Sequence, residues 1–168
     1  YVEAVATSVS GEIDWLQGDV DSACKQLQSA VSLLETLGSP RELADALMSL
    51  AKAQFDAHNI DKAKQSVDRS RLIAEEHGLR DMLVRAHLQL GDIARKQEDA
   101  PRALDHSAAV AELHQPGGRP EMEWLVQYGL YKTHREFGVE ADAQLHGEKA
   151  ILAIESVANG LSHELRKS

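Results

Sequence analysis

Four alanines lie at equal spacing along this chain of 168 residues, and that spacing constrains the fold more than any other feature. Each alanine follows the previous one by 40 residues, in the order Ala23, Ala63, Ala103 and Ala143. Other apolar positions keep the same period: Leu50, Leu90 and Leu130, preceded by Ala46, Ala86 and Val126. A fixed period of this length is typical of proteins built from stacked supersecondary units. The period therefore predicts a repeat protein, whose units offer a surface to another molecule. The alternative is an ordinary helical bundle with a chance period.

Turn signals precede each alanine and predict that every repeat is a pair of helices. The turns are Gly18-Asp19-Val20, His58-Asn59-Ile60, Glu98-Asp99-Ala100 and Gly138-Val139-Glu140. Glycine, asparagine and aspartate suit such turns because they tolerate unusual backbone angles or cap the next helix. Apolar residues follow at spacings of 3 and 4, which places them on one face of a second helix. In the last copy the residues assigned to this apolar face are Leu145, Ala150, Ile151 and Ile154.

Helix ends are marked by glycine, proline and capping residues. Gly38, Gly78 and Gly117–Gly118 each follow a predicted second helix, where glycine is the usual stop signal. Ser39 to Glu42 resembles a capping box, with Pro40 at the first helical position. Pro101 likewise starts a second helix.

The residues inside each unit resemble the tetratricopeptide repeat (TPR) family. That family has small residues where two helices touch, a turn with glycine and aspartate or asparagine, and an alanine early in the second helix. The matching positions are Gly18, Asp19, Val20, Ala23, Leu27 and Ala30, then Leu47, Leu50, Ala51, Asn59, Ile60 and Ala63, then Leu90, Gly91, Asp99 and Ala103. The usual repeat has about 34 residues. The longer repeat here is similar to those in regulatory parts of bacterial transcription activators and kinases, and in cytoskeletal adaptor proteins. The family's common first-helix aromatic is missing from the middle copies.

The resemblance implies an all-α fold, a right-handed superhelical solenoid of about four antiparallel helix hairpins. We expect one domain over residues 1–168, with units 1–38, 39–78, 79–118 and 119–158 and a short C-terminal tail. Because the sequence begins at Tyr1 and not at methionine, we interpret it as a fragment of a longer protein.

Charge and cysteine content exclude several classes of function. The formal net charge of −9 argues against direct nucleic-acid binding, which needs clustered lysine and arginine. No apolar run approaches the roughly 18 residues of a membrane span, so no membrane partner is expected. Cys24 is the only cysteine, which excludes an internal disulfide and a thiolate zinc site. A reducing, cytoplasmic location fits this cysteine usage.

No catalytic motif is visible in the sequence. The Gly117–Gly118 pair lacks the flanking residues of a phosphate-binding loop, and His-Glu-x-x-His is absent. None of the 8 histidines pair at the spacing that places two metal ligands on one helix face. We therefore predict that the domain is not an enzyme and holds no metal or cofactor.

The resemblance also implies a concave groove lined by the first helices of successive units. The groove-facing positions would be Ser8, Glu12, Trp15, Asp45, Met48, Lys52, Phe55, Arg85, Leu88, Asp92, Arg95, Leu125, Tyr128, Lys132 and Arg135. From these positions we select the aromatic, cationic and methionine side chains as candidate partner-binding residues: Trp15, Met48, Lys52, Phe55, Arg85, Arg95, Tyr128, Lys132 and Arg135.

Two features of the groove allow more than one interpretation. Trp15 and Phe55 occupy the same repeat position and could hold an apolar side chain of a ligand, or simply pack between units. The cations of the later copies could select an acidic peptide or a carboxylate. They could equally form a solvated face with paired neighbours such as Asp92 and Glu136.

The function implied by the resemblance is a scaffold that binds a peptide or partner helix in the groove. The alternative is a regulatory or sensor domain of a larger transcription regulator or kinase, which an attached ATPase, kinase or DNA-binding domain would favour. Because a solenoid ends in apolar faces unless they are capped, we also expect self-association through its ends.

Overall fold

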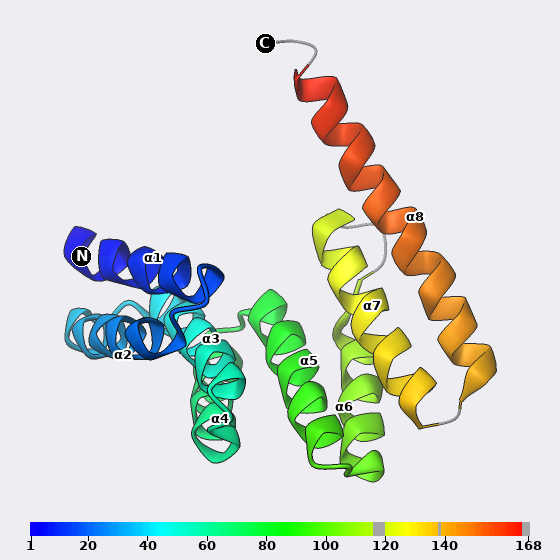
Figure 1. Ribbon diagram of the computed structural model, residues 1–168, viewed down its shortest axis with the longest axis horizontal. Helices are drawn as coiled ribbons and strands as arrows, with labels where there is room; N and C mark the ends of the chain where they lie inside the picture. The colour runs from blue at the N-terminus through cyan, green and yellow to red at the C-terminus, as the bar shows by residue number, and fades with distance from the viewer. Residues whose placement is uncertain (116–119, 138, 166–168) are drawn as a thin grey trace. The chain divides into compact units, whose positions relative to one another are not determined.

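The described part of the chain is entirely helical. The computed structural model describes residues 1–115, 120–137 and 139–165, with side chains up to residue 160. These residues form eight helices and no strand (Figure 1): α1 (Val2–Leu16), α2 (Val20–Leu37), α3 (Pro40–Asp56), α4 (Ile60–Glu76), α5 (Arg80–Lys96), α6 (Ala100–Leu113), α7 (Pro120–Glu136) and α8 (Glu140–Leu165). The predicted all-α helical repeat class is confirmed. None of the described helices is long and apolar enough to cross a membrane.

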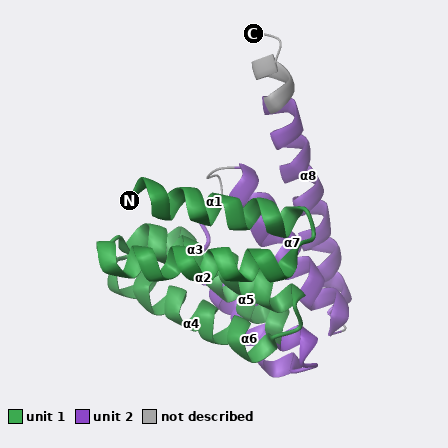
Figure 2. Ribbon diagram, turned by 60° about the vertical axis from the view of Figure 1, so that its left-hand side comes forward, with its two compact units in different colours: residues 1–93 green, residues 94–168 purple. Residues whose placement is uncertain are grey.

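The helices pack as antiparallel neighbours within two compact units. α1 packs on α2, α2 on α3 and α3 on α4 in the first unit, residues 1–93. α6 packs on α7 and α7 on α8 in the second unit, residues 94–168 (Figure 2). That residues 1–168 form one domain stays a prediction.

The four periodic alanines occupy one structural position. Each is the fourth residue of a second helix, and their exposed fractions are 0% at Ala23, Ala63 and Ala103 and 2% at Ala143. The backbone N–H of each donates to the carbonyl of the residue just before its helix, at 2.9–3.0 Å. Ala63, for example, packs in a cluster with Met48 and Ala51 of α3. A methyl group at this position lets the two helices of a hairpin approach closely, which explains why the period is so regular.

The predicted turns are confirmed at the three places that the structure describes fully. The first turn residue adopts a positive φ in each: 87° at Gly18, 60° at His58 and 57° at Glu98. The next residue is the N-cap of the second helix, and the carboxylates of Asp19 and Asp99 accept backbone N–H bonds there. Gly138 of the fourth turn lies outside the described residues.

Helix ends agree with the sequence except at the capping box. Gly38 and Gly78 follow α2 and α4 with φ of 62° and 64°, which confirms two glycine stops, whereas Gly117–Gly118 lies outside the described residues. Pro40 is the first residue of α3, but the Ser39 side chain makes no capping hydrogen bond. The carboxylate of Glu42 accepts a hydrogen bond from the Tyr1 hydroxyl at 3.0 Å, so the predicted capping box is wrong.

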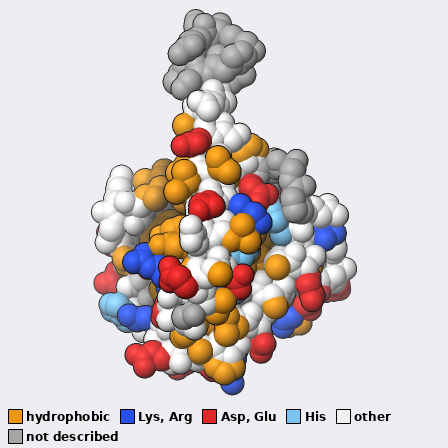
Figure 3. Space-filling view, turned by 90° about the vertical axis from the view of Figure 1, so that its right-hand side faces the viewer, with side chains coloured by type: hydrophobic (Ala, Val, Ile, Leu, Met, Phe, Trp, Pro, Cys, Tyr) orange, Lys and Arg blue, Asp and Glu red, His pale blue; other side chains and the backbone are white. Residues whose placement is uncertain are grey.

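The apolar face predicted for the last second helix is also wrong. Leu145, Ile151 and Ile154 are 47%, 58% and 49% exposed, whereas Ala150 and Ala153 are buried. α7 has 17 residues and α8 has 26, so α8 continues to Leu165 in place of the predicted tail and outruns its partner. The buried stripe of α8 consists of Ala143, Ala150 and Ala153, at spacings of 7 and 3, and the three larger residues lie outside it. Leu145 and Ile154 even stand on opposite sides of the helix, because at 100° per residue nine residues turn it by half a revolution. Figure 3, which views the side where α8 lies in Figure 1, shows hydrophobic side chains exposed among charged ones.

Candidate partner-binding site

A cavity of about 220 Å³ lies in the first unit among α1, α2, α3 and α5. Its lining consists of Glu12, Trp15, Leu16, Leu27, Asp45, Ser49, Lys52 and Arg85. Three predicted partner-binding residues, Trp15, Lys52 and Arg85, therefore surround one space. Asp45, Ser49 and Lys52 reach it together because spacings of 4 and 3 place them on one face of α3.

Lys52 is the central cation of this cavity. Its Nζ lies 5.8 Å from the centroid of the Trp15 ring, and the side chain is half-buried. Burial lowers the pKa of Lys52, the nearby Arg85 charge lowers it further, and Glu12 and Asp45 oppose both effects. Among the described residues, Lys52 forms no ion pair and no hydrogen bond. The cavity thus holds an ammonium group that has lost part of its hydration without gaining an anionic partner at bonding distance.

The surrounding polar side chains are fixed by their own hydrogen bonds. Arg85 Nη1 donates to Asp45 Oδ1 at 2.7 Å, so its charge is largely matched. The Ser49 hydroxyl donates to Glu12 Oε1 at 2.6 Å. Such bonds hold the walls of the cavity in one arrangement, which is what a preorganised binding site requires.

Trp15 of α1 and Phe55 of α3 are held by different contacts. Trp15 Nε1 donates to Asp56 Oδ2 at 2.7 Å, and its ring packs against the core beneath α1. Phe55 packs against the cluster of α3, α4 and α5 side chains that contains Met48. For Phe55 this contact supports the interpretation that it packs between successive repeats, here within the first compact unit.

The prediction that Met48 lines the groove is wrong. This residue is 1% exposed and lies in the core with Ala86, Leu90 and Ile93 of α5. Met48 stands at the edge of the α3 stripe, where α5 covers it, so its side chain cannot contact a partner in the groove.

In the second unit, Arg95 has a partner of its own. Its Nε donates to Glu136 Oε2 at 2.6 Å. Glu136 is one of the acidic neighbours expected if the cationic residues form a solvated, paired face. The guanidinium is thus matched in charge and contributes little to a basic groove.

The remaining predicted residues lie on α7 beside aromatic rings. Lys132 Nζ is 5.3 Å from the ring centroid of Tyr128, which is 42% exposed. Arg135 stands 5.7 Å from the Tyr131 ring and donates to its hydroxyl at 2.6 Å. Trp124 stacks on Tyr128 at 5.7 Å, and Tyr128 on Tyr131 at 6.2 Å. Trp124 and Tyr131 were not among the predicted residues, although their spacings of 4 and 3 about Tyr128 indicate one helix face.

Histidine chemistry in the described residues does not assemble a metal site. No group of three or more His, Cys, Asp or Glu side chains there could hold a metal ion. His134 and His146 do stack at 5.3 Å, and Nδ1 of His146 lies 2.7 Å from Gln127 Oε1. Burial lowers the pKa of His146, and the charges of His134 and Lys149 lower it further.

Comparison with solved structures supports the fold but not a family. The chain is similar to BtubC (BKLC) from P. vanneervenii, with a TM-score of 0.72 and 13% identity. The match covers 92% of this chain and 64% of that protein, so the chain spans about two thirds of its length. At this identity the likeness shows only that the two share a helical fold. No protein-family model matches the chain, and neither does any curated protein sequence.

Proposed function

We propose that this chain is a protein–protein interaction module of the TPR type, which takes a peptide or partner helix into the groove beside α1, α3 and α5. The observation that carries the proposal is Lys52, a half-buried ammonium beside Trp15 without a bonded anion. A carboxylate from a partner would restore the interactions that burial took from this cation. Hydrogen bonds to charged groups contribute about 1.5–3 kcal/mol, so one such contact can anchor a segment.

The charges around Lys52 refine the kind of partner that fits. Glu12 and Asp45 line the same cavity, and Arg85 is already paired. The groove is therefore of mixed charge, and a uniformly acidic peptide would meet repulsion. The best partner carries one carboxylate for Lys52, with an apolar group to contact Trp15 and neutral or basic residues on either side.

A peptide array with matched variants tests this proposal. Arrayed 12-residue peptides with a single Asp or Glu, a single Asn or Gln, or several acidic residues are probed with the labelled chain. We expect the single-carboxylate peptides to bind best and Lys52→Met to lose them. Lys64→Met is the control, because Lys64 is an exposed lysine on α4 that pairs with Asp68. Retention of the same peptides by Lys52→Met would refute the anchor.

A charge reversal tests the broader basic groove separately. The double variant Arg95→Glu with Arg135→Glu changes cations of the second unit only. If the whole groove selects acidic partners, this variant loses them as well. If Lys52 is the anchor, peptide recovery stays near the wild-type level.

The second candidate function is a regulatory or sensor domain of a larger cytoplasmic transcription regulator or kinase. One observation favours it: the first unit has another cavity, lined by both polar and apolar side chains of α2, α3 and α4. A sensor responds to a small ligand, whereas an adaptor needs only its groove. Neither role requires catalysis.

A further inference from the structure

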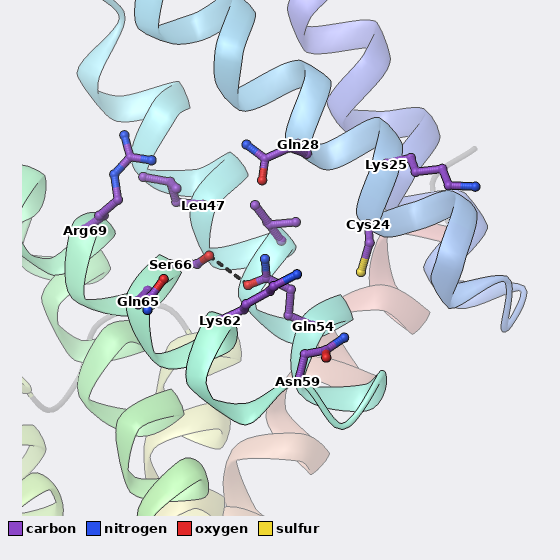
Figure 4. A pocket seen from close by; sticks show the side chains of 11 residues that line it. Cys24, Lys25, Gln28, Leu47, Gln54, Asn59, Lys62, Gln65, Ser66 and Arg69 are labelled. Atoms are coloured by element: carbon purple, nitrogen blue, oxygen red, sulfur yellow. Dashed lines mark hydrogen bonds between the residues drawn. The ribbon is translucent and has the colours of Figure 1, made fainter.

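The second cavity is distinct from the smaller cavity around Lys52, which forms part of the proposed groove. It is open to solvent and has a volume of about 600 Å³. It lies between α2, α3 and α4 (Figure 4). α3 contributes Leu47, Leu50 and Gln54 to it, and contributes Asp45, Ser49 and Lys52 to the groove. At 100° per residue these two sets lie on opposite faces of α3. A ligand in the second cavity would therefore not compete directly with one at Lys52.

The floor of this cavity presents an unused hydrogen-bond donor. Gln54 is only 8% exposed, and its Oε1 accepts a hydrogen bond from the Ser66 hydroxyl at 2.8 Å. Its Nε2 donates to no other described residue, and the side chain points into the cavity (Figure 4). Among the described residues, the one fully buried side-chain nitrogen or oxygen without a partner is Nδ1 of His134, so Gln54 Nε2 is open to the space of the cavity. This donor can therefore reach an acceptor atom on a ligand.

The rim of the cavity is cationic. Lys25 of α2 and Lys62 of α4 line it, and neither forms an ion pair with a described residue. Arg69 stands at the same rim with Glu35 as its partner. The lining contains no aspartate or glutamate. In a chain with a net charge of −9, this is a local reversal of sign.

We propose that this cavity binds a small, multiply charged anion that carries carboxylate or phosphate groups. Lys25 and Lys62 would each pair with one charged group of the ligand, and Gln54 Nε2 would donate to an oxygen between them. The volume falls in the range of about 300–1,000 Å³ typical of small-molecule sites. The site goes beyond the peptide groove in both place and ligand.

Titration calorimetry with two probe anions tests the proposal. Citrate and inorganic pyrophosphate are titrated into the chain, and sodium chloride of equal ionic strength is the blank. Binding of citrate alone indicates a carboxylate ligand, and binding of pyrophosphate alone indicates a phosphate ligand. Lys25→Gln with Lys62→Gln should weaken binding at least about tenfold, whereas Lys64→Gln, on the same helix but outside the lining, should not. Failure of both anions to bind at millimolar concentration, or equal binding by the double variant, would overturn the proposal.

Two further measurements locate the bound anion. Gln54→Glu keeps the acceptor for Ser66 but replaces the amide donor with a negative charge, so binding should be lost while the circular dichroism spectrum is unchanged. Cys24 lines the cavity and is the only cysteine of the chain. A saturating anion should slow its alkylation by iodoacetamide several-fold. An unchanged alkylation rate would place the anion elsewhere, and Lys52→Gln, which alters only the groove, should leave all these results intact.

Discussion

Replacing His58 or Glu98 by glycine should stabilise the fold, because both residues occupy a backbone conformation that favours glycine. Their φ angles are 60° and 57°, close to those of the glycines that end α2 and α4. Both side chains are exposed and make no hydrogen bond or ion pair with a described residue. Substitution therefore removes backbone strain without removing a contact.

The magnitude follows from two opposing effects. A residue with a Cβ pays about 1–2 kcal/mol in the left-handed region. Glycine in turn increases the entropy of the unfolded chain, which costs about 0.4–1 kcal/mol. The net gain is roughly 0.5–1 kcal/mol for each substitution. Gly18 gives the reverse case: its φ is 87°, and an added Cβ would meet nothing within 4 Å. Gly18→Ala should therefore destabilise by a similar amount, through the backbone alone.

Urea unfolding followed by circular dichroism measures these differences. With a urea m-value of about 1–3 kcal/mol/M, His58→Gly should raise the midpoint by a few tenths of a molar. His58→Ala keeps the strain and removes the imidazole, so it should stay near wild type. A lower midpoint for His58→Gly, or no change in Gly18→Ala, would refute the strain argument.

Three other outcomes follow from the packing. Gly11→Ala should destabilise by about 1–3 kcal/mol in urea unfolding, because its Cβ would stand 2.7 Å from Cγ of the fully buried Leu27. Burial holds the pKa of His146 below 6.5, so the unfolded chain takes up this proton first as the pH falls. Stability should thus decline below about pH 6.5, through the native pKa, and His146→Gln should show a shallower decline; identical slopes would contradict this. Self-association through the exposed face of α8 should give a light-scattering mass that rises with concentration and falls in Ile151→Glu. A constant mass of one chain would reject it.

Burial was predicted correctly at positions that recur in every repeat. It was predicted wrongly at positions whose burial depends on how far a neighbouring helix extends. Ala63 and Leu90 were assigned correctly to the core because every copy needs a small or apolar residue where helices touch. Met48 was misplaced, because a stripe at spacings of 3 and 4 does not show how far α5 extends over its edge. Ile151 was assigned to an apolar helix face, but it is exposed. The sequence of one helix does not show which of its faces a neighbouring helix covers. The cavity around Gln54 draws on three helices, and no single one shows an anion-binding pattern.

Side-chain pairs between successive repeats explain why the sequence overestimated the basic character of the groove. Trp15 donates to Asp56, and Arg95 donates to Glu136, in both cases 41 residues along the chain. Arg85 donates to Asp45, 40 residues back. An alignment of the copies identifies the position of each cation. It does not reveal that a carboxylate of the neighbouring repeat pairs with that cation and neutralises its charge.

Lys52 is left without a bonded anion because the carboxylate one repeat away already has another partner. Its counterpart 40 residues back is Glu12, which is where the pattern of Arg85 and Asp45 would place a partner. The carboxylate of Glu12 instead accepts the Ser49 hydroxyl at 2.6 Å. Ser49→Ala should release Glu12 to pair with Lys52, and the affinity for single-carboxylate peptides should fall several-fold. Ser32→Ala, an exposed serine of α2, is the control. If Ser49→Ala binds these peptides as tightly as the wild type does, Ser49 does not hold Glu12 away from Lys52.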